Sequence, residues 1–121
     1  MITLIFLSFR HSNFDMSDLN HREVFQEFAE KAEKELGDSL NQLVLYGSVA
    51  RGEESENSDI DVFAVVQEKK DLELLRNLAF DTGVLENGVS ISVQGKLEKD
   101  FQGFSESSYL RNIDSDGVRY A

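Results

Sequence analysis

The sequence predicts a small α/β (α+β) domain in which a mixed β-sheet is flanked by helices, and three observations support this prediction. The chain has 121 residues, enough to bury one hydrophobic core but not two. Segments with helical spacing of apolar residues alternate along it with short apolar or alternating segments typical of strands. Proline is absent and the eight glycines follow several of these segments, so glycine is expected to end them.

An amphipathic helix is predicted within residues 19–36, where apolar side chains recur at i, i+3 and i+4. Either Ser17 or Asn20 can cap it, and Asn20 with Glu23 forms a capping-box pair. Gly37 is placed to end it. A second helix is predicted over residues 71–86, and shorter ones over residues 97–104 and 109–113.

Strands are predicted over residues 42–46, 59–66, 89–94 and 117–121. Residues 63–66 are apolar without alternation, which is typical of a strand buried on both faces and therefore central in its sheet. Residues 89–94 alternate apolar and polar side chains, so this strand should have one solvated face.

Residues 1–15 are interpreted as an N-terminal extension or an added edge strand, and residues 16–121 as the domain. Met16 is an alternative natural start, because helical sequence follows it directly. The apolar run at residues 1–10 is too short to span a bilayer, and it lacks the features of a signal peptide. No membrane association is therefore expected.

The composition restricts the possible functions. The chain has 12 Lys and Arg against 23 Asp and Glu, a formal net charge of −11, so nucleic-acid binding by its own surface is not expected. It has no cysteine, which excludes disulfides and thiolate chemistry and favours a cytoplasmic location. His11 and His21 lack the spacing of metal ligands and are expected at the surface.

The turn after the first strand is a candidate phosphate-binding site. Gly47 and Ser48 follow residues 42–46 directly, which leaves backbone N–H groups and a hydroxyl at the end of the strand, where a following helix would add its positive N-terminal end. Arg51 lies three residues further on, so its guanidinium can reach the same anion.

Asp59 and Asp61 form a candidate metal site. Two positions apart on a strand, their side chains are expected on the same face, where they repel each other unless a cation lies between them. Mg²⁺ suits this position, since it is typically held by one or two carboxylates and the phosphates of a substrate. A phosphate site beside such a pair is what phosphoryl or nucleotidyl transfer requires.

Gly47-Ser48, ten intervening residues and then Asp59-Ile60-Asp61 resemble the Gly-Ser-x10-Asp-x-Asp signature of the DNA polymerase beta-like nucleotidyltransferase superfamily. The segment GSVARG…SDIDV is most similar to its minimal bacterial and archaeal members. The resemblance implies that Gly47 and Ser48 bind a nucleoside triphosphate, most simply ATP, with Arg51 as an accessory phosphate contact. It also implies that Asp59 and Asp61 are catalytic and bind Mg²⁺ or Mn²⁺.

The family commonly has a third carboxylate on the next strand of the core. Here the candidate positions on that strand are Ser90 and Ser92, and residues 89–94 contain no Asp or Glu. Glu86 and Glu98 flank the strand and are the alternatives.

Two functions therefore follow from the resemblance. The first is transfer of a nucleoside monophosphate to an acceptor hydroxyl, as in minimal family members that modify a small helical partner toxin of the HEPN type. The second is a non-catalytic nucleotide-binding or partner-binding protein that has lost the third carboxylate.

Overall fold

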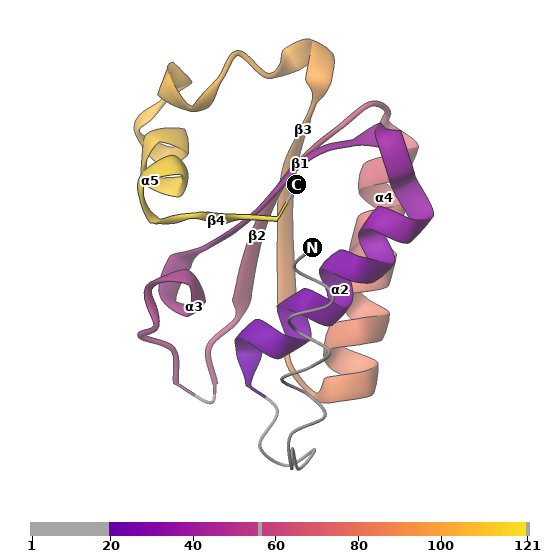
Figure 1. The fold of residues 1–121 in the computed structure, drawn as a ribbon, viewed down its shortest axis with the longest axis vertical. Coiled ribbons are helices and arrows are strands. Elements are labelled where there is room, and N and C mark those ends of the chain that lie inside the picture. The colour runs from indigo at the N-terminus through magenta and orange to yellow at the C-terminus, as the bar shows by residue number, and fades with distance from the viewer. Residues whose placement is uncertain (1–19, 56, 121) are drawn as a thin grey trace.

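The computed structural model describes residues 20–55 and 57–120, which fold as a mixed α/β domain, as predicted (Figure 1). Its main elements are α2 (His21–Leu36), β1 (Leu40–Tyr46), α3 (Gly47–Arg51), β2 (Ile60–Val66), α4 (Lys69–Ala79), β3 (Ile91–Leu97), α5 (Ser108–Asp116) and β4 (Val118–Arg119). The strand order is β3-β2-β1-β4. Strand β1 is antiparallel to β2 and β4, whereas β2 and β3 are parallel. The prediction of a central strand at β2 is confirmed.

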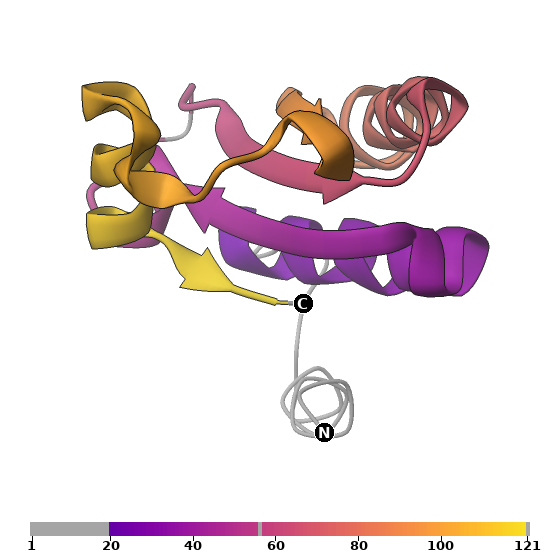
Figure 2. The ribbon, with the colours of Figure 1, turned by 90° about the horizontal axis from the view of Figure 1, so that it is seen from above.

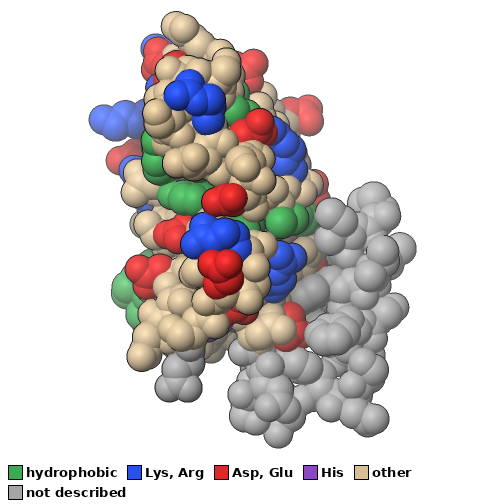
Figure 3. Space-filling model, turned by 90° about the vertical axis from the view of Figure 1, so that its left-hand side faces the viewer, with side chains coloured by type: hydrophobic (Ala, Val, Ile, Leu, Met, Phe, Trp, Pro, Cys, Tyr) green, Lys and Arg blue, Asp and Glu red, His purple; other side chains and the backbone are tan. Residues whose placement is uncertain are grey.

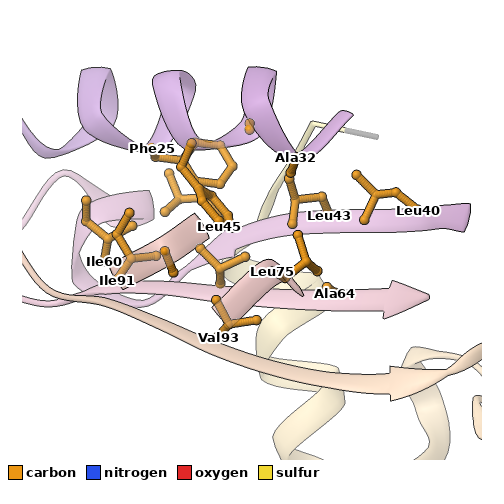
Figure 4. Close-up of a cluster of buried hydrophobic side chains, with 14 of the residues drawn as sticks. Phe25, Ala32, Leu40, Leu43, Leu45, Ile60, Ala64, Leu75, Ile91 and Val93 are labelled. Atoms are coloured by element: carbon orange, nitrogen blue, oxygen red, sulfur yellow. The ribbon is translucent and has the colours of Figure 1, made fainter. Parts of the chain in front are cut away.

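Helices α2 and α4 lie side by side on one face of the sheet (Figure 1). Their apolar side chains point toward β1, β2 and β3 and form the larger core (Figure 4). The largest fully buried members of this layer are Phe28, Leu43, Leu45, Ile60 and Leu75. Burial stabilises the fold by about 1.5–3 kcal/mol for each such side chain.

The opposite face of the sheet carries a smaller core. Val44, Phe63 and Val65 are buried there against Leu110 and Ile113 of α5. Phe101 and Phe104 pack on Phe63, with ring centroids 6.0 and 5.8 Å from its own. Seen from above, the strands run between α5 and α4, and β4 lies beside β1 (Figure 2).

The start of α2 confirms the predicted capping box. The Asn20 side chain accepts a hydrogen bond from the backbone N–H of Glu23, and the Glu23 carboxylate accepts one from the N–H of Asn20. Gly37 ends the helix with φ at +53°. The surface position expected of His21 is wrong, because this side chain is buried, and its Nε2 has no hydrogen-bond partner among residues 20–55 and 57–120. His11 lies outside the described residues.

The second predicted helix is divided in two. Helix α4 begins two residues before the predicted start and ends at Ala79, and a π-helical segment, η3, follows over Phe80–Leu85. A Cβ atom on Gly83 would overlap the carbonyl oxygen of Val89, so the chain approaches itself closely here. The predicted end of the helix at Gly88 is confirmed, since its N–H bonds to the carbonyl of Val84.

The single helix predicted over residues 97–104 is wrong. This segment contains the end of β3, a 3₁₀ turn at Glu98–Asp100 and an irregular stretch before a second 3₁₀ turn at Phe104–Glu106. The aromatic side chains of Phe101 and Phe104 pack on Phe63 from this segment. The last predicted helix is longer than expected, and the terminal strand is confirmed as β4.

Residues 1–15 lie outside the described part of the chain, so neither interpretation of them is tested. Within residues 20–55 and 57–120, no helix combines the length and apolar character needed to cross a membrane.

Candidate functional site

The candidate site lies where β1 ends and α3 begins. Gly47 has φ at +78°, a conformation that disfavours residues with a side chain. A Cβ atom at this position would overlap Oδ2 of Asp61 and lie 3.3 Å from its Cγ. Glycine is therefore required for two independent reasons, and the turn that precedes Ser48 lies directly against the Asp61 carboxylate.

Asp61 is half-buried on β2, between two strands. Its Cα partners are Tyr46, the last residue of β1, and Ser92 of β3. Burial raises the pKa of Asp61, and the negative charge of Asp59 raises it further, whereas Arg51 lowers it. Asp59 is exposed and lies immediately before β2 rather than within it, so its strand position is corrected by one residue.

This pair of carboxylates fits a divalent cation. Asp59 and Asp61 are close enough to repel each other, and the turn at Gly47 brings backbone groups to the same place. A cation between two carboxylates removes their repulsion, and oxygen ligands are those that Mg²⁺ prefers. Among the described residues, no group of three or more acidic or histidine side chains is arranged to hold a metal ion. Mg²⁺ commonly completes its coordination with water and with substrate oxygens.

Ser48 is the second residue of α3 and is half-buried. Its carbonyl oxygen accepts a hydrogen bond from the N–H of Glu53, which closes the turn after Gly52. Its hydroxyl makes no hydrogen bond within the described part of the chain, and this leaves it available to a ligand.

Arg51 is exposed and lies at the end of α3, held by two carboxylates. Its Nε lies 3.0 Å from Oε1 of Glu53, and its Nη1 lies 3.2 Å from Oδ2 of Asp116 in α5. Figure 3 shows the face that carries α3 and α5, where basic, acidic and hydrophobic side chains lie in contact with one another. To contact a phosphate, Arg51 would have to give up at least part of these ion pairs.

The register of β2 and β3 identifies the position next to Asp61 on the following strand. It is Ser92, because the two residues are Cα partners, whereas Ser90 precedes the strand. Glu86 forms an ion pair with Lys31 of α2, in which Oε1 of Glu86 lies 2.9 Å from Nζ of Lys31. Glu98 follows the far end of β3, about 20 Å along the strand from Ser92. Neither glutamate is paired with Asp61 in the register of β2 and β3.

Two aromatic residues at the site were given no functional role by the sequence analysis. The hydroxyl groups of Tyr46 and Tyr109 lie 2.9 Å apart, and their rings meet edge to face. Burial raises the pKa of Tyr46, and the hydrogen bond to Tyr109 and the charge of Asp61 add to this effect. No spacing signal in the sequence links Tyr46 to a residue 63 positions away.

The fold and these side chains define an α/β protein with an acidic site at one end of a mixed sheet, next to a glycine-dependent turn. Residues 22–116 match the sequence model of the nucleotidyltransferase domain family. The chain belongs to this family.

The chain is also similar to individual known proteins. A curated relative from Methanocaldococcus jannaschii, whose name assigns it protein adenylyltransferase activity, is 41% identical over 46 residues, which are 38% of this chain and 46% of the relative. The match thus spans about half of that relative. A crystal structure of a toxin–antitoxin with AMP-PNP has a TM-score of 0.51 at 17% identity, over 78% of this chain and 70% of that one. A Sulfolobus solfataricus protein described as a nucleotidyltransferase has a TM-score of 0.45 at 19% identity, over 81% and 77%.

Proposed function

We propose that this protein transfers a nucleoside monophosphate from a nucleoside triphosphate, most simply ATP, to an acceptor hydroxyl and releases pyrophosphate. The observation that carries the proposal is the contact between the Gly47 turn and the Asp61 carboxylate. It brings together a turn suited to phosphate and a carboxylate suited to a cation, which nucleotidyl transfer needs in one place. Membership of the nucleotidyltransferase domain family supports the same reaction class.

Each residue of the site would have a separate role in binding the nucleotide and in the transfer. Backbone N–H groups after Gly47 and the Ser48 hydroxyl would bind the phosphates that leave as pyrophosphate. Asp59 and Asp61 would hold Mg²⁺ or Mn²⁺, which when bound supplies positive charge to the phosphates and to the attacked phosphorus. Arg51 would exchange Glu53 or Asp116 for a phosphate oxygen. The rigid turn would keep the phosphate chain in line with the incoming hydroxyl.

The acceptor that we propose is a hydroxyl-bearing side chain of a partner protein, with a small helical protein of the HEPN type as the candidate. The name of the Methanocaldococcus jannaschii relative supports a protein acceptor. The toxin–antitoxin structure with AMP-PNP supports a nucleotide and a protein partner on a shared fold. The cytoplasm remains the expected location.

A second candidate function is nucleotide or partner binding without catalysis. Ser92 favours it, because this residue lies beside Asp61 and has no carboxylate to activate an acceptor hydroxyl. General-base help of this kind accelerates reactions by about 10²–10⁴-fold.

Thermal unfolding with ATP, in the presence and absence of Mg²⁺, tests the proposed binding site. A ligand at one hundred times its Kd stabilises the native state by about 2.7 kcal/mol. The double variant Asp59→Asn/Asp61→Asn should lose the Mg²⁺-dependent part of this stabilisation. The matched control Asp38→Asn/Asp81→Asn, which removes two exposed charges elsewhere, should keep it. Equal stabilisation of the parent and the first variant would contradict the proposed metal site.

Transfer of label from each α-labelled triphosphate, with and without the protein encoded by the neighbouring gene, separates the two candidate functions. If the parent is a slow enzyme that lacks a base, Ser92→Asp should raise the rate. Full activity of the parent with no gain from Ser92→Asp would assign the base to another residue. Bound nucleotide with no transfer by either protein would establish the non-catalytic function.

A further inference from the structure

Tyr109 is a large aromatic residue that the fold holds at the surface beside the candidate site. It is the second residue of α5, and 48% of its surface is exposed. The hydrophobic contact of α5 with the sheet is made by Leu110 and Ile113, which are 2% and 1% exposed. The ring of Tyr109 is therefore not needed to fill the core.

The position of this ring is fixed by Tyr46. The two hydroxyl groups lie 2.9 Å apart, and the ring centroids are separated by 6.2 Å at an interplanar angle of 90°. The edge-to-face contact of the rings, together with the hydrogen bond between the hydroxyl groups, restricts the side-chain torsions χ1 and χ2 of Tyr109. Because the side chain is already held in one orientation, a ligand that packs on the ring does not have to pay the entropy cost of ordering it.

Tyr46 also connects this ring to the carboxylates. It is the residue before Gly47 and the Cα partner of Asp61. At the other end of α5, Asp116 forms the ion pair with Arg51 of α3. Helix α5 is therefore attached to the site at both ends, with Tyr109 one side chain away from Asp61.

We propose that Tyr109 stacks against the base of the bound nucleotide and that Tyr46 is the residue that positions it. This inference rests on the proposed function, since it requires the triphosphate to lie along Gly47, Ser48 and Asp61. A nucleotide bound there places its base away from the carboxylates, and an exposed, fixed aromatic ring on the adjoining helix offers a π-face to any of the four bases.

The inference is tested by measuring binding of two probes, ATP and inorganic tripolyphosphate, each with Mg²⁺ and without any acceptor. The probes share the triphosphate, but only ATP has a base. Tyr109→Ala should weaken ATP binding by about 5- to 150-fold, the range found when stacking on an aromatic side chain is removed. It should leave the affinity for tripolyphosphate unchanged.

Three further variants make the test specific. Tyr109→Phe keeps the ring and should stay within a few-fold of the parent, whereas Tyr109→Leu keeps apolar bulk without a ring and should resemble Tyr109→Ala. Phe80→Ala removes an aromatic side chain of similar exposure, 54%, at the end of α4, and should change neither affinity. Unfolding curves without ligand identify any variant that fails to fold, and the comparison of Tyr109→Phe with Tyr109→Leu then carries the test.

Equal weakening of ATP and tripolyphosphate would overturn the inference, because it would assign Tyr109 to the phosphate end of the site. Unchanged binding of both probes would also overturn it, and the exposed ring of Tyr109 would then be assigned to contact with the acceptor. Failure of the parent to bind either probe would contradict the proposed function itself, and the inference would fall with it.

Discussion

A single glycine determines how the phosphate-binding turn and the carboxylates meet. Gly47 combines a positive φ with a position against Asp61, whereas Gly52, at the other end of α3, has φ at +73° with open space around it. Both glycines are therefore favoured by the positive φ of the backbone, but only at Gly47 would a side chain also overlap Asp61. Comparing the two positions separates the effect of Gly47 on the stability of the fold from its effect on the candidate site.

We predict that Gly47→Ala and Gly52→Ala each lower the free energy of unfolding by about 1–2 kcal/mol, because both place alanine in the left-handed region. Only Gly47→Ala should also displace Asp61 and lose the Mg²⁺-dependent stabilisation by ATP. Chemical denaturation measures the first effect, and thermal unfolding with and without Mg-ATP measures the second. Retained stabilisation in a folded Gly47→Ala protein would show that the contact with Asp61 is not needed for binding.

At this scale the sequence predicted Gly47, Ser48, Asp59 and Asp61 as a group, because they lie close together in the chain, at the end of one strand segment and the start of the next. It did not predict that Arg51 pairs with Asp116 or that Tyr46 pairs with Tyr109. Those partners lie 65 and 63 positions apart, and local spacing contains no information about contacts that depend on how α5 returns to the sheet.

At the scale of elements, the junction between α2 and the π-helical segment η3 depends on Lys31. Its Nζ lies 2.9 Å from Oε1 of Glu86, 3.4 Å from Oε2 of Glu27 and 3.3 Å from Oγ1 of the buried Thr82. Apolar periodicity predicted one continuous helix over residues 71–86, and α4 itself ends at Ala79. The change of hydrogen bonding in η3 accompanies the close approach of Gly83 to Val89, a contact that the spacing of apolar residues does not encode.

The same contacts predict how stability depends on pH. Burial alone would lower the pKa of Lys31, but the hydrogen bond to Glu86 and the charge of Glu27 raise it above its ordinary value of 10.5. The hydrogen bond from Lys31 lowers the pKa of Glu86 below 4.5. The carboxylate of Glu86 therefore stabilises the fold above pH 4.5, and this contribution is lost as the pH falls further. The contribution of Lys31 is present below pH 10.5 and is lost as the pH rises above it.

Glu86→Gln should lower the melting temperature at pH 7, and its difference from the parent should shrink as the pH falls below 4.5 and through the lowered pKa of Glu86. The control Glu73→Gln, at an exposed position of α4, should change the melting temperature little at either pH. Melting curves between pH 3 and 8 measure both. A difference for Glu86→Gln that persists unchanged at pH 3 would mean that the side chain acts through packing rather than through its charge.

At the scale of the whole molecule, the net charge and the topology of the sheet depend on different features of the sequence. The order of the elements and the central position of β2 follow from hydrophobic patterning. The strand order does not, because the antiparallel return of β4 to β1 depends on where α5 packs. The net charge of −11 is independent of both, and it creates a repulsion that the folded chain must overcome.

Two electrostatic effects of opposite sign determine how salt changes stability. Salt weakens the exposed ion pairs, such as Arg51 with Glu53 and Lys31 with Glu86, but ion pairs at the surface stabilise a fold only slightly. Salt also screens the repulsion among the acidic residues, which outnumber the basic ones by 23 to 12. At 0.01 M salt the screening length is about 30 Å, so nearly all of these charges interact, whereas at 0.1 M it is about 10 Å.

The repulsion involves the whole molecule and the ion pairs are local, so we expect NaCl to raise the melting temperature between 0.01 and 0.3 M. The increase should be several degrees, since about 1 kcal/mol corresponds to about 4–8 °C in a domain near this size. A variant with Glu35→Gln, Asp38→Asn, Glu73→Gln and Asp81→Asn loses four exposed charges, none of which forms an ion pair within the described part of the chain. It should melt at a higher temperature than the parent in 0.01 M NaCl and respond less to added salt, because part of the repulsion is already gone. A parent protein whose melting temperature falls with NaCl would show instead that the ion pairs between elements outweigh the excess negative charge.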